Sequence, residues 1–177
     1  MFTLCNQMAY NGIMVNGVSR SSVDGKLDRF DSADGPLITP SHWVDEPATT
    51  PGSHCQPNEI VRLKKALTYL FQQGVKASEV FAISPFRAVA DQLESLESAY
   101  PGLRAGTIHT AQGREAPVVI LVLGGDPSKP GAKNWASTTV NLVNVAVSRA
   151  QRPLYVIGDR ASWRHCHYFD QLSNALP

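Results

Sequence analysis

The segment Thr107–Leu123 has the sequence TIHTAQGREAPVVILVL, in which a polar loop leads into an unbroken apolar run, Val118–Leu123. Two further apolar runs lie on either side of this segment, at Val80–Ile83 and at Leu154–Ile157. Short continuous apolar runs are typical of parallel strands that are buried on both faces. We therefore expect all three runs to be interior strands of one sheet, with Ala105–Thr110 as a further strand.

Segments with helical periodicity alternate with these apolar runs. In the first of them Ile60 and the leucines that follow recur at helical spacing, with Arg62 and two lysines off that face. The predicted helices are Asn58–Gln73, Val89–Tyr100, Leu142–Gln151 and a last helix from about Ser162. Strands that alternate with helices imply crossover connections. The expected fold is therefore α/β, with a mostly parallel sheet and helices on both of its faces.

A different composition marks Asn11–Pro57, which is rich in Gly, Ser, Asp, Thr and Pro. This composition indicates an irregular, insertion-like segment at about residues 11–57, with an extended edge strand near Trp43. Because 177 residues leave room for one domain, we expect residues 1–177 to form a single domain. The helical pattern of the first residues further predicts that the chain is a piece of a longer protein.

The composition disfavours several classes of protein. Lys and Arg number 16 and Asp and Glu number 15, and a net charge of +1 does not favour a polyanion binder that relies on bulk charge. The sequence has no apolar run of about 18 residues, which a membrane-spanning helix requires, and no secretory signal pattern. Its 3 cysteines form no CxxC pair. These features predict a cytoplasmic protein without membrane contact.

Two smaller features predict structure rather than chemistry. The segment His165–His167 reads HCH, but a lone HCH without a distant pair of ligands does not match the usual zinc spacings, so we expect no metal site. Trp43, Trp135 and Trp163 are expected to be packing residues rather than platforms on which nucleic-acid bases stack.

Arg149 interrupts the apolar face of the predicted helix Leu142–Gln151. On a helical wheel Leu142, Val145 and Ala146 share one face, and Arg149 falls on that same face. Helix geometry leaves two interpretations open. Arg149 is either a cation that complements the dipole at the helix C-terminus and extends to solvent, or an arginine held at an inter-domain surface to meet a phosphate.

The loop Thr107–Glu115 carries more hydrogen-bonding side chains than a simple turn requires. Gly113 allows the backbone to approach a ligand, and Glu115 has a carboxylate that accepts from hydroxyls or orients a water. Gln112 and His109 have groups that bond a sugar or a base. On residue chemistry alone, a polar connection that caps the next element is the simpler interpretation.

Together these segments resemble a known family. Thr107–Leu123 and Asn141–Asp159, NLVNVAVSRAQRPLYVIGD, look like motifs V and VI of superfamily 1 helicases, especially of the 1B branch. Ser84–Arg87, SPFR, is similar to the segment after the first strand of the second RecA-like domain in that branch. Leu4–Gly12, LCNQMAYNG, is similar to the helix that opens this domain. The resemblance covers nearly the whole chain and implies a C-terminal RecA-like domain of the P-loop NTPase type.

The resemblance also implies roles for particular residues. Arg149 matches the motif VI arginine finger that reaches the γ-phosphate of ATP, and Glu115 matches the motif V glutamate near the nucleotide. Both are therefore the expected catalytic residues, and Gln112 and Gly113 complete the expected ATP-binding set. The residues expected to face a nucleic-acid strand are Ser84, Pro85, Arg87, Thr107, His109 and Asn144.

The sequence lacks two parts of a complete motor, because neither a G-x-x-x-x-G-K-[ST] phosphate loop nor an acidic magnesium-binding motif occurs in it. The resemblance therefore implies that a first RecA-like domain of the same protein supplies the phosphate loop and the Mg²⁺ ligands. ATP and Mg²⁺ would bind between the two domains, and this chain alone would not hydrolyse ATP. The other expected partner is single-stranded DNA or RNA. The alternative function is a non-catalytic nucleic-acid-binding or protein-binding module with a degenerate helicase fold.

Overall fold

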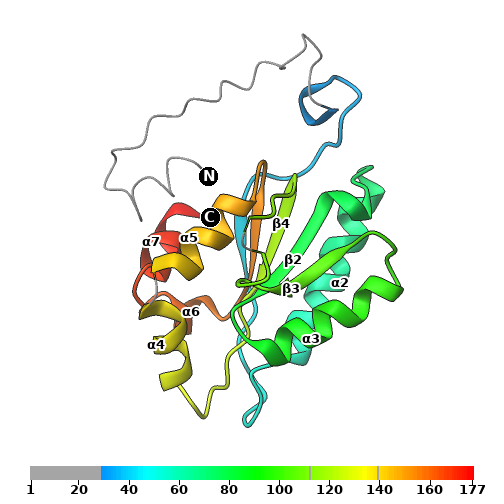
Figure 1. Cartoon of the computed structure of the whole chain (residues 1–177). Helices are drawn as coiled ribbons and strands as arrows, with labels where there is room; N and C mark the ends of the chain where they lie inside the picture. Colours follow the sequence, from blue (N-terminus) through cyan, green and yellow to red (C-terminus); the bar gives the residue numbers. More distant parts are fainter. Residues whose placement is uncertain (1–28, 112, 139) are drawn as a thin grey trace.

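A five-stranded parallel sheet forms the centre of the computed structural model, which describes residues 29–111, 113–138 and 140–177 (Figure 1). The strand order is β1-β5-β4-β2-β3, and every neighbouring pair is parallel. The strands are β1 (His42–Asp45), β2 (Val80–Ser84), β3 (Arg104–Thr107), β4 (Val118–Val122) and β5 (Leu154–Gly158). The predicted α/β fold and its edge strand near Trp43 are confirmed, while the predicted helix Leu4–Gly12 lies outside the described residues.

Helices cover both faces of the sheet, as predicted. Figure 1 shows α2 and α3 on one face and α4 to α7 on the other. Right-handed crossovers explain this division, because the chain moves along the sheet in one direction from β1 to β3 and in the opposite direction from β4 to β5. The helices are α2 (Pro57–Gln72), α3 (Arg87–Ser95), α4 (Gly131–Thr138), α5 (Val140–Arg149), α6 (Arg160–Trp163) and α7 (Phe169–Ala175), with short 3₁₀ turns η1 (Arg29–Asp31), η2 (Ala77–Glu79) and η3 (Leu96–Ser98). Among the described helices none has both the length and the apolar character needed to cross a membrane.

The predicted apolar segments form the core. Every residue of β2, β4 and β5 is buried, which accounts for their unbroken apolar sequences. Helix α2 packs on β4 and β5 and buries Leu63, Leu67 and Leu70, as its periodicity predicts. Trp43 on β1 and Trp163 on α6 are buried as well, so both are packing residues as expected.

Four regions differ from the predictions. The helix predicted at Val89–Tyr100 ends at Ser95 and is followed by the 3₁₀ turn η3. The last helix, predicted from about Ser162, is divided into α6 and α7.

Strand β3 ends at Thr107 rather than at residue 110, because Thr110 Oγ1 donates to the Thr107 carbonyl at 2.8 Å and the chain turns there. Helix α4 forms where no helix was predicted. Its Trp135 is 54% exposed, so the expectation of a packing role is wrong for this tryptophan. The apolar pattern did not reveal α4 because its buried face includes Lys133 and Ser137.

Candidate functional site

The predicted site residues lie at two opposite edges of the sheet. Because all strands are parallel, their carboxyl ends share one edge and their amino ends share the other. Ser84 ends β2, Pro85 and Arg87 follow it, and Thr107 ends β3, so this group lies at the carboxyl edge. Glu115 precedes β4 and Arg149 precedes β5, so this second group lies at the amino edge.

The polar loop Thr107–Glu115 is not confined to one of these edges. Since β3 and β4 are parallel, residues 108–117 must carry the chain back from the carboxyl edge to the amino edge. The loop Thr107–Glu115 therefore begins at the carboxyl edge and ends at the amino edge. At the carboxyl end of β5, Asp159 Oδ1 caps α6 by accepting from Ser162 N at 2.9 Å.

Backbone pairing brings Glu115 and Arg149 together at the amino edge. Ala116 N donates to the Arg149 carbonyl at 3.0 Å, and Gln151 N donates to the Ala116 carbonyl at 3.0 Å. These bonds form an isolated parallel bridge between Ala116 and Ala150. The Glu115 carboxylate accepts from Gln151 Nε2 at 3.2 Å. Two segments that are far apart in sequence thus hold Glu115 and Arg149 in one place.

The Arg149 side chain is half-buried at the C-terminal end of α5. Its Nε donates to the Val145 carbonyl at 3.2 Å, and its Nη2 donates to Ser148 Oγ at 2.9 Å. Within the described ranges Arg149 forms no ion pair with a carboxylate. The bond to Val145 fits the interpretation of Arg149 as a cation at the helix C-terminus. The absence of a carboxylate partner among the residues that the structure describes fits the interpretation of Arg149 as an arginine that meets a phosphate.

The turn before β4 is open. Gly113 has φ +79°, a left-handed conformation that favours glycine, and a Cβ at this position would meet no atom within 4 Å. Gly113 and Glu115 are both exposed, so the backbone of this turn is accessible. Gln112, the remaining residue predicted to bind ATP, lies outside the described residues.

At the carboxyl edge the turn after β2 is mostly buried. Ser84 is 0% exposed, and its Oγ accepts from Phe86 N at 3.2 Å, so the side chain shapes the turn. Pro85 is also buried, whereas Arg87 at the start of α3 is exposed. Any side-chain contact that this turn makes with a nucleic-acid strand therefore falls to Arg87.

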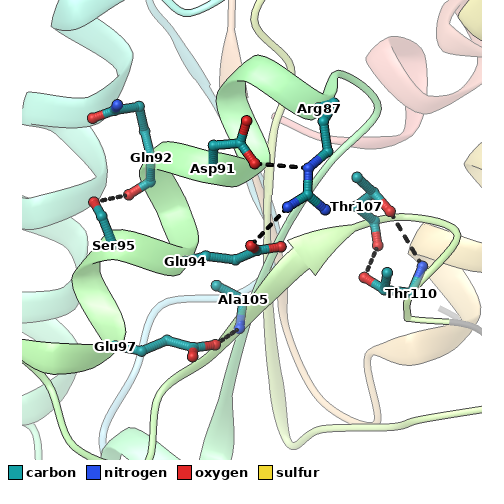
Figure 2. Close-up of polar contacts among 9 residues, drawn as sticks. All are labelled: Arg87, Asp91, Gln92, Glu94, Ser95, Glu97, Ala105, Thr107 and Thr110. Atoms are coloured by element: carbon teal, nitrogen blue, oxygen red, sulfur yellow. Dashed lines mark hydrogen bonds and ion pairs between the residues drawn. The ribbon is translucent and has the colours of Figure 1, made fainter.

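The turn after β3 lies beside this arginine (Figure 2). Thr107 is half-buried and His109 is exposed. Ile108 N donates to the Ser84 carbonyl at 3.0 Å, which ties this turn to the turn after β2. Asn144 lies apart from both turns on α5, where its Oδ1 is buried and has no hydrogen-bond partner among the described residues.

Sequence reasoning missed a buried polar cluster at the carboxyl end of β4. Glu59 on α2 is 0% exposed, and its Oε2 accepts from Gly124 N at 2.8 Å. Burial raises the pKa of Glu59 from 4.5 to about 8. Lys133 and Asp126 are buried nearby, at 4% and 1% exposure. A signal was present, because Glu59 is four residues before Leu63 and so falls on the apolar face of α2.

Residues 1–161 match the model of the family described as the AAA domain. The chain belongs to this family. It is 32% identical over 133 residues, 71% of its length, to a probable helicase of Dictyostelium discoideum. It is 32% identical over 104 residues, 58% of its length, to the rat (Rattus norvegicus) DNA-binding protein SMUBP-2. It is also 30% identical over 121 residues, 61% of its length, to the human (Homo sapiens) 3′-5′ exoribonuclease HELZ2.

These matches and the parallel sheet make the chain a superfamily 1 helicase-like domain with a RecA-like α/β fold, as the motifs predict. The aligned part spans only 13% of the Dictyostelium protein, 10% of the rat protein and 4% of the human protein.

Proposed function

We propose that this chain is the second RecA-like domain of an ATP-dependent superfamily 1 helicase or translocase. Arg149 is the arginine finger, Glu115 is the second catalytic residue, and Gln112 and Gly113 complete the ATP-facing set. A first RecA-like domain of the same protein supplies the phosphate loop and the Mg²⁺ ligands. On the strand-facing side, the side chains of Arg87, Thr107 and His109 contact the strand. The buried residues Ser84 and Pro85 shape the turn that presents Arg87, and the predicted strand residue Asn144 lies apart from them on α5.

The meeting of Glu115 and Arg149 at the amino edge carries this proposal. The Ala116–Arg149 hydrogen bond of 3.0 Å fixes the end of α5 against the turn that precedes β4. Arg149 is half-buried and lacks a carboxylate partner in the part of the chain that the structure describes. A partly desolvated guanidinium is stabilised by a bidentate anion. A phosphate presented by a second domain is such an anion.

The residues at this edge suit the phosphates of ATP. The fork of Arg149 offers several N–H donors, and the exposed turn at Gly113 leaves space for a ligand to approach. Bound ATP would supply the phosphoryl group, and Mg²⁺ would neutralise part of its charge. Arg149 would then stabilise the charge that develops on that group, an effect worth about 10³–10⁵ in turnover in other phosphoryl-transfer enzymes.

Arg87, Thr107 and His109 lie at the carboxyl edge of the sheet, one strand length away. Strand β4 has 5 residues, which at about 3.3 Å per residue separates the two edges by roughly 15 Å. Residues 108–117 connect them, so closure of two domains on ATP would move the strand-facing edge. The names of the Dictyostelium and rat relatives, a probable helicase and a DNA-binding protein, support a nucleic-acid substrate. Contacts to backbone and sugar would make binding tolerant of sequence.

The test is strand-stimulated ATPase activity in a protein that joins this chain to its phosphate-loop domain. Arg149→Ala is expected to lower kcat by about 10³-fold or more. Lys65→Ala is the control, because Lys65 is an exposed cation in the middle of α2, outside both proposed sites. This control is expected to leave kcat unchanged, and the 177-residue chain alone is expected to show no magnesium-dependent ATPase activity.

Each alternative has a distinct result. Activity in the joined protein that is unaffected by Arg149→Ala would refute the finger role. Activity in the isolated chain that Arg149→Ala abolishes would refute the need for a second domain. Binding of a strand or a protein without any ATPase activity in the joined protein would instead identify a non-catalytic module.

A further inference from the structure

Arg87, the exposed cation of the predicted strand-facing edge, is already occupied by carboxylates of its own helix. Its Nε lies 2.7 Å from Asp91 Oδ1, and its Nη2 lies 3.0 Å from Glu94 Oε2 (Figure 2). The guanidinium thus holds two carboxylates at once. A phosphate of a nucleic-acid backbone would use the same N–H donors.

Helix stability does not explain this arrangement. Arg87 is the first residue of α3, next to the positive end of the helix dipole, where a cation is unfavourable. In the pair with Asp91 the cation precedes the anion, which is the weaker order for a helical ion pair. The Arg87 and Asp91 side chains are 61% and 53% exposed, so solvent screens their attraction. An exchangeable contact fits these facts better than a structural one.

Glu94 lies nearer than Asp91 to the end of β3. A Cβ at Gly106 would lie 3.5 Å from Glu94 Oε1 and would collide with Thr110 Oγ1. Glu94 and the Thr107–Thr110 turn therefore meet at the same glycine, and Glu94 links α3 to the turn after β3. The Glu94 side chain is 34% exposed and that of Asp91 is 53% exposed, so solvent screens the charge of Glu94 less.

We propose that Glu94, assisted by Asp91, occupies the phosphate position at Arg87 in the strand-free protein and sets the affinity for a nucleic-acid strand. A strand phosphate must displace the Glu94 carboxylate before Arg87 engages it. This inference rests on the proposed function, because it specifies how one edge of the proposed strand site is regulated. It adds Glu94 as a residue that determines affinity without touching the strand.

The test is binding of the full chain to a labelled oligo-dT and a labelled oligo-rU of about 20 nucleotides, followed by fluorescence anisotropy at low salt. Glu94→Gln keeps the size of the side chain and removes its charge. It is expected to tighten binding by about two- to fivefold, the range that a screened ion pair supports. Asp170→Asn removes one charge from an exposed position on α7 and is expected to change affinity less.

The double variant separates competition from simple charge repulsion. If Glu94 competes with phosphate for Arg87, Glu94→Gln gains little in an Arg87→Gln background. An equal gain with and without Arg87 would overturn the competition, as would an unchanged affinity in Glu94→Gln. A chain that binds neither oligonucleotide, in wild type or variant form, would overturn the proposed strand site itself together with this inference.

Discussion

Substituting the buried carboxylate Glu59 tests whether its burial makes the free energy of unfolding fall as pH rises. The side chain is 0% exposed, accepts one hydrogen bond from Gly124, and has a second oxygen, Oε1, without a hydrogen-bond partner among the described residues. Desolvation raises its pKa from 4.5 to about 8, opposed by the Gly124 hydrogen bond and by Lys133. The carboxyl group is therefore protonated in the folded protein at neutral pH.

The sign of the pH dependence follows from this raised pKa. Below pH 4.5 the folded and unfolded forms are both protonated, so the group favours neither form. Between pH 4.5 and about 8 the unfolded chain has released its proton and the folded chain has not, so stability falls as pH rises. At about 1.4 kcal/mol for each pH unit, the total loss is on the order of 5 kcal/mol. Above pH 8 this contribution is constant.

Glu59→Gln removes the charge and keeps an oxygen for Gly124 N. We expect wild type and variant to have similar free energies of unfolding near pH 5, and the variant to be several kcal/mol more stable near pH 9. Urea unfolding followed by tryptophan fluorescence measures both. Asp170→Asn controls for the change in net charge. A difference between wild type and Glu59→Gln that stays constant from pH 5 to pH 9 would contradict the argument.

Two further substitutions test the packing of α2 on the sheet and of the turn after β4. Leu67→Ala removes a side chain that is 0% exposed between α2 and the sheet, and should lower the free energy of unfolding by about 2–5 kcal/mol in urea titrations. Gly124→Ala should destabilise the protein by about 1–3 kcal/mol, because Gly124 has φ +63° and a Cβ would lie 2.5 Å from the His54 carbonyl oxygen. A thermal midpoint equal to that of wild type would contradict either expectation. Gly52→Ala is the control for Gly124→Ala, because Gly52 has φ +83° and a Cβ there would meet no atom within 4 Å. It therefore measures backbone strain without a collision.

Sequence reasoning worked best where the signal is local. The runs at β2, β4 and β5 identified three strands because strands buried on both faces must be apolar throughout. The spacing of the leucines identified α2 because one stripe of a helix faces the core. Helix α4 has no such stripe, since Lys133 and Ser137 are among its buried residues.

Site prediction had a similar limit. The motifs predicted a catalytic role for both Glu115 and Arg149, and the Ala116–Ala150 bridge brings their backbones together, while the role itself stays a prediction. The same motifs did not reveal that Ser84 is buried in a turn or that Glu94 and Asp91 hold Arg87. Ion pairs between exposed side chains leave no periodic trace in a sequence, because neither partner has to be apolar or regularly spaced.

The amino-acid sequence determined the types of the main elements and the family. A buried strand or helix face needs apolar residues at a regular spacing, and residues close in sequence show that spacing. The strand order β1-β5-β4-β2-β3 was decided only by the tertiary structure, since it depends on how right-handed crossovers pack helices on two faces. That order, with parallel strands, sends residues 108–117 back across the sheet. It thereby places Arg149 and Glu115 at one edge and Arg87 and Thr107 at the other, a separation that no local pattern contains.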